Sequence, residues 1–143
     1  MLGQAIVFLL IFLWVIIKMK ATTIESHNKR INFLVNHISQ NIDEEYSVAE
    51  LADMVAMSQF HFHRVFKGIV GEPVKEYIRR LRLERAAKEL VTTNKQIKVI
   101  QEESQYSSAE AFSRAFKIRY GVSPTEYRNN MSWTQIAADS VSQ

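Results

Sequence analysis

Two segments of the sequence, centred on Arg64 and Arg114, carry the same cationic, aromatic and small residues at the same spacing. A shift of 50 residues superposes eight identical residues. The pairs are Ser58 and Ser108, Phe62 and Phe112, Arg64 and Arg114, Phe66 and Phe116, Lys67 and Lys117, Gly71 and Gly121, Glu76 and Glu126, and Tyr77 and Tyr127. Two similar cores explain the repeated Phe and Tyr, whereas repeated Arg and Lys at solvent-facing positions indicate a shared partner or a shared ancestry.

The first segment is suited to hydrogen bonding with base edges in a DNA groove. In a helix-turn-helix unit the second helix enters the major groove with its N-terminal residues towards the bases, so it needs long donors opposite an apolar stripe. Phe60, His61, Arg64 and Lys67 share the helix side that faces away from the repeated phenylalanines. Arg64 is the best candidate for bidentate contact with guanine, and His61 and His63 can donate or accept nearby.

The second segment holds fewer groups for base contact. Arg114 repeats the guanine-type candidate with Ser113 and Lys117 beside it, while Ala109 offers only a methyl contact. Glu110 can accept from a cytosine amino group, although a solvated carboxylate at a helix start is the better explanation. We therefore expect the second segment to be the weaker reader.

Charge is unevenly distributed along the chain, although 18 basic and 15 acidic residues give a net charge of only +3. Residues 39–57 contain five acids and no base, and residues 60–88 contain eight bases and three acids. Such an uneven charge distribution steers a polyanion towards one face, and a solvated helix surface is the less favoured alternative. The cations expected to contact phosphate are Lys67, Arg79, Arg80 and Lys117.

The rest of the soluble part is expected to be helical, because glycine and proline are sparse and strand-like alternation is absent. Ser47 and Ser58 are placed to cap two short helices, and Glu50 completes a capping box with Ser47. The apolar positions expected to face the interior are Ile31, Leu34, Val35 and Ile38, then Val48, Leu51, Ala52 and Val55, then Phe62, Val65, Phe66 and Ile69.

A long helix is predicted from Pro73 to about Val91, with an apolar stripe that changes face midway. With about 18 residues it is about 27 Å long. Together with the flanking bodies it can therefore set two reading helices about 34 Å apart, one turn of DNA. One chain could then read two successive major grooves, and a monomer suffices.

The chain opens on an apolar run, with no charged side chain before Lys18 and unbroken apolar residues over 5–17. Including its flanks, the run reaches roughly 17 to 19 residues, the lower limit for a membrane crossing. A secretory signal is disfavoured because basic residues are missing before the run and no small-residue cleavage site follows it. Basic residues after the run predict that the remainder lies in the cytoplasm. We expect an inner-membrane anchor over residues 1–20, with the last helix of a longer membrane protein as the alternative.

Residues from about Asn28 to Arg128 resemble the DNA-binding domain of the AraC/XylS family of bacterial transcription regulators. The resemblance rests on SVAELADMVAMSQFHFHRVFKGIVGEPVKEYIRRLRLERAAKEL and on SSAEAFSRAFKIRYGVSPTEYR. It implies an all-α fold of seven helices, with two helix-turn-helix subdomains joined by a long linker helix, and regulation of transcription, usually activation. It also implies double-stranded promoter DNA and RNA polymerase as partners. By the family pattern, the base-reading positions are Phe60, His61, His63, Arg64, Ala109, Glu110, Ser113 and Arg114.

The resulting organisation places a single transmembrane helix ahead of the regulator. The expected parts are an anchor over 1–20, a juxtamembrane segment and amphipathic helix over 21–42, a first helix-turn-helix over 43–72, a linker helix over 73–93, a second helix-turn-helix over 94–129 and a polar tail over 130–143. Family members commonly carry a separate sensor domain, for which we expect no room here.

Two residues depart from the family pattern inside the second helix-turn-helix. Gln101 stands where the family usually has alanine, and Gln105 where it usually has a glycine at the turn. Because glutamine enters a left-handed turn only at a cost, the second unit is expected to be less stable or differently angled.

Other function classes have little support. His61 and His63 are two residues apart, so on a helix they do not face one another and make a poor metal pair. The four glycines build no phosphate-cradling loop. We therefore expect no enzyme activity, no cofactor and no metal. The remaining alternative is a membrane-anchored helical module that binds a protein and not DNA.

Overall fold

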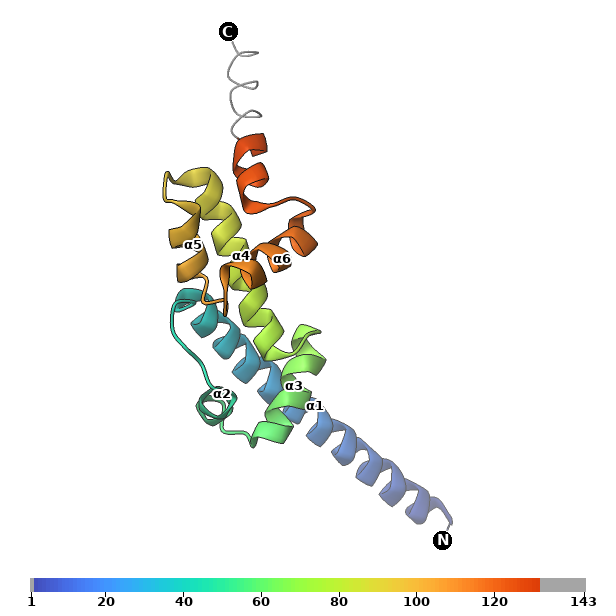
Figure 1. Cartoon of the computed structure of the whole chain (residues 1–143). Coiled ribbons are helices and arrows are strands. Elements are labelled where there is room, and N and C mark those ends of the chain that lie inside the picture. The colour runs from blue at the N-terminus through green and yellow to red at the C-terminus, as the bar shows by residue number, and fades with distance from the viewer. Residues whose placement is uncertain (1, 132–143) are drawn as a thin grey trace. The chain divides into compact units, whose positions relative to one another are not determined.

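The structure, a computed structural model, describes residues 2–131, and all regular secondary structure in that range is helical (Figure 1). The helices are α1 (Leu2–Gln40), α2 (Val48–Met54), α3 (Gln59–Val70), α4 (Val74–Thr92), α5 (Ile97–Glu103) and α6 (Ala109–Tyr120), followed by a further helix over 124–131. The all-α fold and the seven helices are confirmed. The predicted tail begins at residue 130, and all of it beyond residue 131 lies outside the described residues.

Two compact units make up the chain. The first contains α1, α2 and α3, and the second contains residues 41–45 together with α4 beyond its first residue, α5, α6 and the helix over 124–131. α4 begins at Val74, one residue after Pro73, and ends at Thr92, close to the predicted bounds. The sequence pattern also places Val91 on the apolar stripe of this helix, but Val91 is 36% exposed, so that assignment is wrong.

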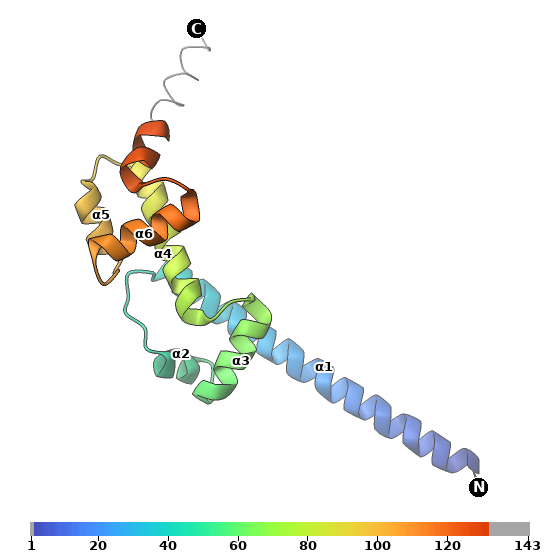
Figure 2. The ribbon, with the colours of Figure 1, turned by 45° about the vertical axis from the view of Figure 1, so that its right-hand side comes forward.

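α1 is a single helix of 39 residues, whereas the sequence suggested two successive elements. Its N-terminal part is exposed, and it is long and apolar enough to cross a membrane. Its C-terminal part buries Ile31, Leu34 and Ile38, three of the four predicted inner positions. Here α1 lies beside α3, as Figures 1 and 2 both show. One continuous helix therefore joins the N-terminal apolar segment to the core of the first unit.

The first unit is organised by helix caps and two phenylalanines. Ser47 and Glu50 form the predicted capping box at the start of α2. Phe62 and Phe66 of α3 are fully buried, with ring centroids 5.6 Å apart. Ile69 is 38% exposed, so its predicted place on the inner face of α3 is wrong.

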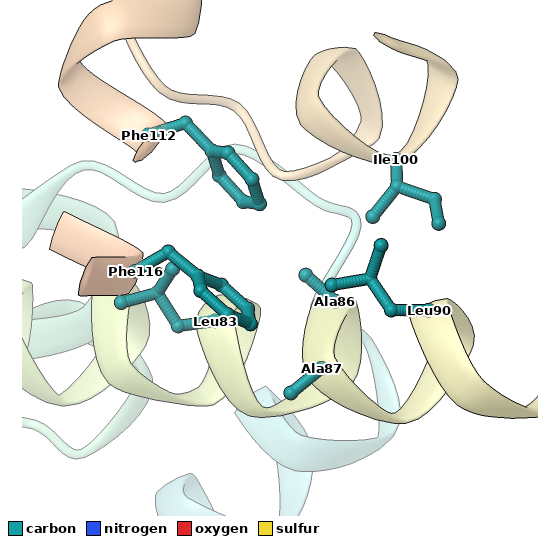
Figure 3. Close-up of a cluster of buried hydrophobic side chains, with 7 residues drawn as sticks. All are labelled: Leu83, Ala86, Ala87, Leu90, Ile100, Phe112 and Phe116. Atoms are coloured by element: carbon teal, nitrogen blue, oxygen red, sulfur yellow. The ribbon is translucent and has the colours of Figure 1, made fainter. Parts of the chain in front are cut away.

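The second unit has a continuous hydrophobic core (Figure 3). Its buried members are Leu83, Ala86, Ala87, Leu90, Ile100, Phe112 and Phe116, from α4, α5 and α6. Tyr106, Tyr120 and Tyr127 pack around it, and burial raises the pKa of the Tyr106 and Tyr120 phenols. The core holds the inner face of α6 through Phe112 and Phe116. The opposite face of the helix is open to solvent or to a partner.

Candidate nucleic-acid interface

α3 and α6 have the same length and the same caps at both ends. Each has 12 residues, begins after a serine whose hydroxyl accepts from the backbone N–H three residues later, and ends at a glycine with positive φ. These glycines, Gly71 and Gly121, have φ of 91° and 80°, a region that favours glycine. The serines are Ser58 and Ser108. The 50-residue repeat in the sequence is thus a repeat of one capped helix.

The outer face of α3 carries Phe60, His63, Arg64 and Lys67, all of them exposed. The Arg64 guanidinium lies 5.8 Å from the centroid of the Phe60 ring, one helical turn away. The Phe60 side chain is 74% exposed, although phenylalanine is among the residues most often buried in folded proteins. An exposed aromatic ring that supports a guanidinium presents both an apolar contact for a thymine methyl group and donors for guanine.

His61 lies on the flank of α3 and contacts α1. Its Nε2 atom is 3.4 Å from the Nε2 atom of His27, and the two rings meet edge to face at 67°, with centroids 5.1 Å apart. No pattern in the sequence signals this contact, because the two histidines are 34 residues apart. The His61 side chain is exposed, but its contact with His27 of α1 restricts its orientation.

On α6 the predicted base-reading residues differ in their surroundings. Ala109, Glu110 and Arg114 are exposed, and Arg114 has no hydrogen bond or ion pair within residues 2–131. Ser113 is half-buried and its hydroxyl accepts from the Gln101 side-chain amide of α5 at 3.3 Å. The structure therefore assigns Ser113 a role inside the unit in addition to any contact with a ligand.

The two glutamines that depart from the family pattern both make new contacts. Gln105 has φ of 54°, so it adopts the left-handed turn that the sequence suggested. Its side-chain amide donates to the Asp43 carbonyl at 2.6 Å, which holds the strained turn in place. In the first unit Ala56, with φ of 52°, occupies the corresponding turn after α2. That second left-handed residue was not predicted.

The four cations predicted to contact phosphate are not equally available. Lys67 and Lys117 are exposed and form no salt bridge within the described residues. Arg79 is mostly exposed and pairs with Glu76 at 3.0 Å. Arg80 is 30% exposed, pairs with Glu84 at 2.9 Å and lies over the Tyr77 ring.

Two further arginines of the basic stretch are structural. Arg82 donates to the carbonyls of Ile42 and Glu44 at 3.2 and 2.9 Å. Arg85 pairs with the Asp43 carboxylate and donates to the Glu103 carbonyl at 2.8 Å. The charge pattern of the sequence thus overstates the number of cations that face a ligand.

The chain is similar to known DNA-binding proteins. A family model described as a helix-turn-helix domain matches residues 51–130. The HTH-type transcriptional activator AarP of Providencia stuartii is 42% identical over 91 residues, 64% of this chain and 67% of AarP. The regulatory protein SoxS of Salmonella typhimurium is 32% identical over 106 residues, 74% of this chain and 99% of SoxS. A solved transcriptional regulator from Chromobacterium violaceum, with an AraC-type DNA-binding domain, matches with a TM-score of 0.67 and 29% identity over 72% of this chain and 92% of that one.

Proposed function

Because the chain belongs to the AraC/XylS family of DNA-binding transcription regulators, we propose that α3 and α6 enter successive major grooves of one duplex. The observation that supports this most directly is the pair of identically capped helices with Arg and Lys at matching exposed positions. α4 has 19 residues and is thus about 28 Å long, which suits reading helices spaced one DNA turn apart, about 34 Å.

Base contact is proposed for the exposed side of the two helices. On α3 it involves Phe60, His61, His63 and Arg64, and on α6 it involves Ala109, Glu110, Ser113 and Arg114. Arg64 and Arg114 are the guanine-reading pair, because both guanidinium groups are exposed and free of carboxylate partners among residues 2–131. Ser113 must share its hydroxyl with Gln101, so its contribution is the smallest of the polar residues.

Phosphate contact is proposed for Lys67, Lys117, Arg79 and Arg80. The two lysines are the principal members, since each lies one turn beyond the arginine of its reading helix. Arg79 and Arg80 already pair with Glu76 and Glu84, so a phosphate must compete with a carboxylate there. These contacts give affinity and register, and not sequence choice.

The regulator is proposed to activate transcription, with RNA polymerase as a protein partner. AarP, the relative that is 42% identical, is a transcriptional activator. A protein that occupies one side of the duplex over two grooves leaves the neighbouring DNA open to polymerase.

The apolar part of α1 is proposed to anchor this regulator in the inner membrane, with the DNA-binding units in the cytoplasm. The support is the exposed apolar surface of residues 2–17, followed by Lys18 and Lys20. The Lys18 ammonium lies 4.5 Å from the Trp14 ring centroid, a pair suited to the interface between lipid and water.

Footprinting of the full chain on a selected operator tests the two-groove arrangement. We expect protection of two major grooves on one side of the duplex, and log affinity that falls linearly with log salt concentration. Protection of one groove would remove α6 from the interface. Binding that is insensitive to salt, or absent on every duplex, would reject the DNA proposal as a whole.

A further inference from the structure

α1 contacts the first reading helix through a turn that lies before the segment matched as a helix-turn-helix domain. That match begins at residue 51, and His27 precedes it. Its Nε2 atom is 3.4 Å from that of His61, the third residue of α3, and its side chain is half-buried.

A second contact from the same turn of α1 fixes its position against the helix-turn-helix. Arg30, three residues after His27, donates to the Val55 carbonyl at 3.3 Å, and Val55 is the C-cap of α2. Ile31, four residues after His27, is fully buried. This turn of α1 therefore packs on the segment between α2 and α3. The backbone that carries His27 is thereby held in place beside His61.

A hydrogen bond between two imidazoles restricts what His61 can offer to a base. One Nε2 must carry a proton and the other must present a lone pair, so the bond couples the tautomers of the two rings, occupies Nε2 of His61 and restricts its ring orientation. An unrestrained His61 could donate to guanine N7 or O6, or accept from an adenine or cytosine amino group. A restrained His61 offers a base only its Nδ1 atom.

We propose that His27 is a positioning residue that occupies Nε2 of His61 and holds its imidazole in one orientation, and thereby narrows base preference at one operator position. The proposal rests on α3 being a reading helix. It adds a residue of α1, outside the matched helix-turn-helix segment, to the determinants of sequence choice.

Binding of the full chain to a panel of operators with every single-base substitution tests this proposal. We expect His61→Ala to lose discrimination at one position. His27→Ala should lose about two- to tenfold of discrimination at that same position and little elsewhere. The double variant should lose no more than His61→Ala alone, because the two residues act through one contact.

Two matched variants separate positioning from folding. His27→Gln keeps an amide that can bond to an imidazole nitrogen, so we expect it to restore most of the lost discrimination. Asn28→Ala, an exposed neighbour on α1, should leave base preference unchanged. Thermal melting of all variants reports whether α1 remains packed.

Three results would overturn the proposal. One is that His27→Ala weakens binding equally on every operator, which would make its role structural. Another is that it leaves all preferences intact while His61→Ala changes one. The third is that His61→Ala changes no preference, since His27 would then have nothing to position. If the wild-type chain binds no operator selectively, the proposed function itself fails, a result distinct from these three.

Discussion

The two arginines at equivalent positions of α3 and α6 have different neighbours, although their sequence context is repeated. The Arg64 guanidinium lies against the Phe60 ring, whereas the position equivalent to Phe60 in the second unit is Glu110. An aromatic ring restricts the guanidinium and leaves its donors available. Arg114 has no ring at the equivalent position and forms no ion pair within residues 2–131. The helix expected to read bases more strongly, α3, is therefore the one whose arginine is preorganised.

Substitution of these arginines should have unequal effects. We expect Arg64→Ala to cost about 1 to 3 kcal/mol of binding free energy and to relax preference at one base. Arg114→Ala should cost less, with the relaxation at a base about one DNA turn away. Competition binding on substituted operators measures both, with Lys98→Ala of α5 as the charge-matched control outside the reading helices. Equal losses on every sequence would make Arg64 a phosphate contact.

At the scale of elements, capping boxes begin two of the helices, α2 and the helix over 124–131. Glu50 accepts from the Ser47 hydroxyl and backbone N–H, and Glu126 accepts from the Ser123 backbone N–H at 2.9 Å. The Ser47 side-chain and backbone hydrogen bonds lower the pKa of Glu50, and the bonds to Ser123 lower the pKa of Glu126. Both carboxylates thus bind protons less tightly in the folded chain than in the unfolded chain.

Stability should therefore fall with acidification. A lowered folded-state pKa gives a contribution that is present above the unfolded pKa and is lost as the pH falls through the folded pKa. We expect the melting temperature of the Glu50→Gln, Glu126→Gln double variant to depend less on pH in the acidic range, since glutamine caps without titrating. Glu102→Gln, an exposed carboxylate outside these boxes, is the control. An unchanged acid slope in the double variant would assign the acid dependence to other groups.

The continuity of α1 has a consequence for a membrane-anchored regulator. His27 lies nine residues after Lys18, a distance of about 14 Å along the helix. DNA read by α3 would lie near the headgroups, at a distance that exceeds the Debye length of about 8 Å at physiological salt. Phosphates of the duplex and of anionic lipids would therefore repel one another mainly at low salt.

We expect the full chain in nanodiscs to bind its operator more weakly in anionic than in zwitterionic lipid, with a difference that shrinks as salt rises. Insertion of seven alanines after Ala21 lengthens α1 by about 10 Å with little change of face and should reduce the difference. Equal affinity in both lipids would show that the duplex does not approach the bilayer.

At the scale of the whole molecule, internal hydrogen bonds and ion pairs decide which cations remain available to a ligand. Arg82 and Arg85 hold residues 42–44 against α4, and Arg128 donates to the Leu90 carbonyl at 2.8 Å at the end of α4. These arginines satisfy backbone carbonyls, so they stabilise the second unit and add little to a ligand-binding face. Asp43, the partner of Arg85, is 77% exposed, and its ion pair adds little by itself.

Arg85→Ala should therefore change stability more than binding. We expect a loss of about 1 to 3 kcal/mol of unfolding free energy, because the Glu103 carbonyl and the Asp43 carboxylate lose the Arg85 donors. The slope of log affinity against log salt should stay the same, whereas Lys67→Ala should reduce it by about one. Chemical denaturation and salt titration give the two quantities. A reduced slope for Arg85→Ala would place this side chain at phosphate.

The sequence by itself determined the repeated helices, their serine and glycine caps, the capping box at Ser47 and the faces that hold Phe62 and Phe112. All of these depend on interactions within about four residues, and their spacing is visible in the chain. The tertiary structure alone decided that Arg82 and Arg85 are internal, that Gln101 engages Ser113 and that His27 meets His61. Such contacts join residues 12 to 42 positions apart. Packing of one helix on another brings these partners together, and no local spacing in the sequence encodes it.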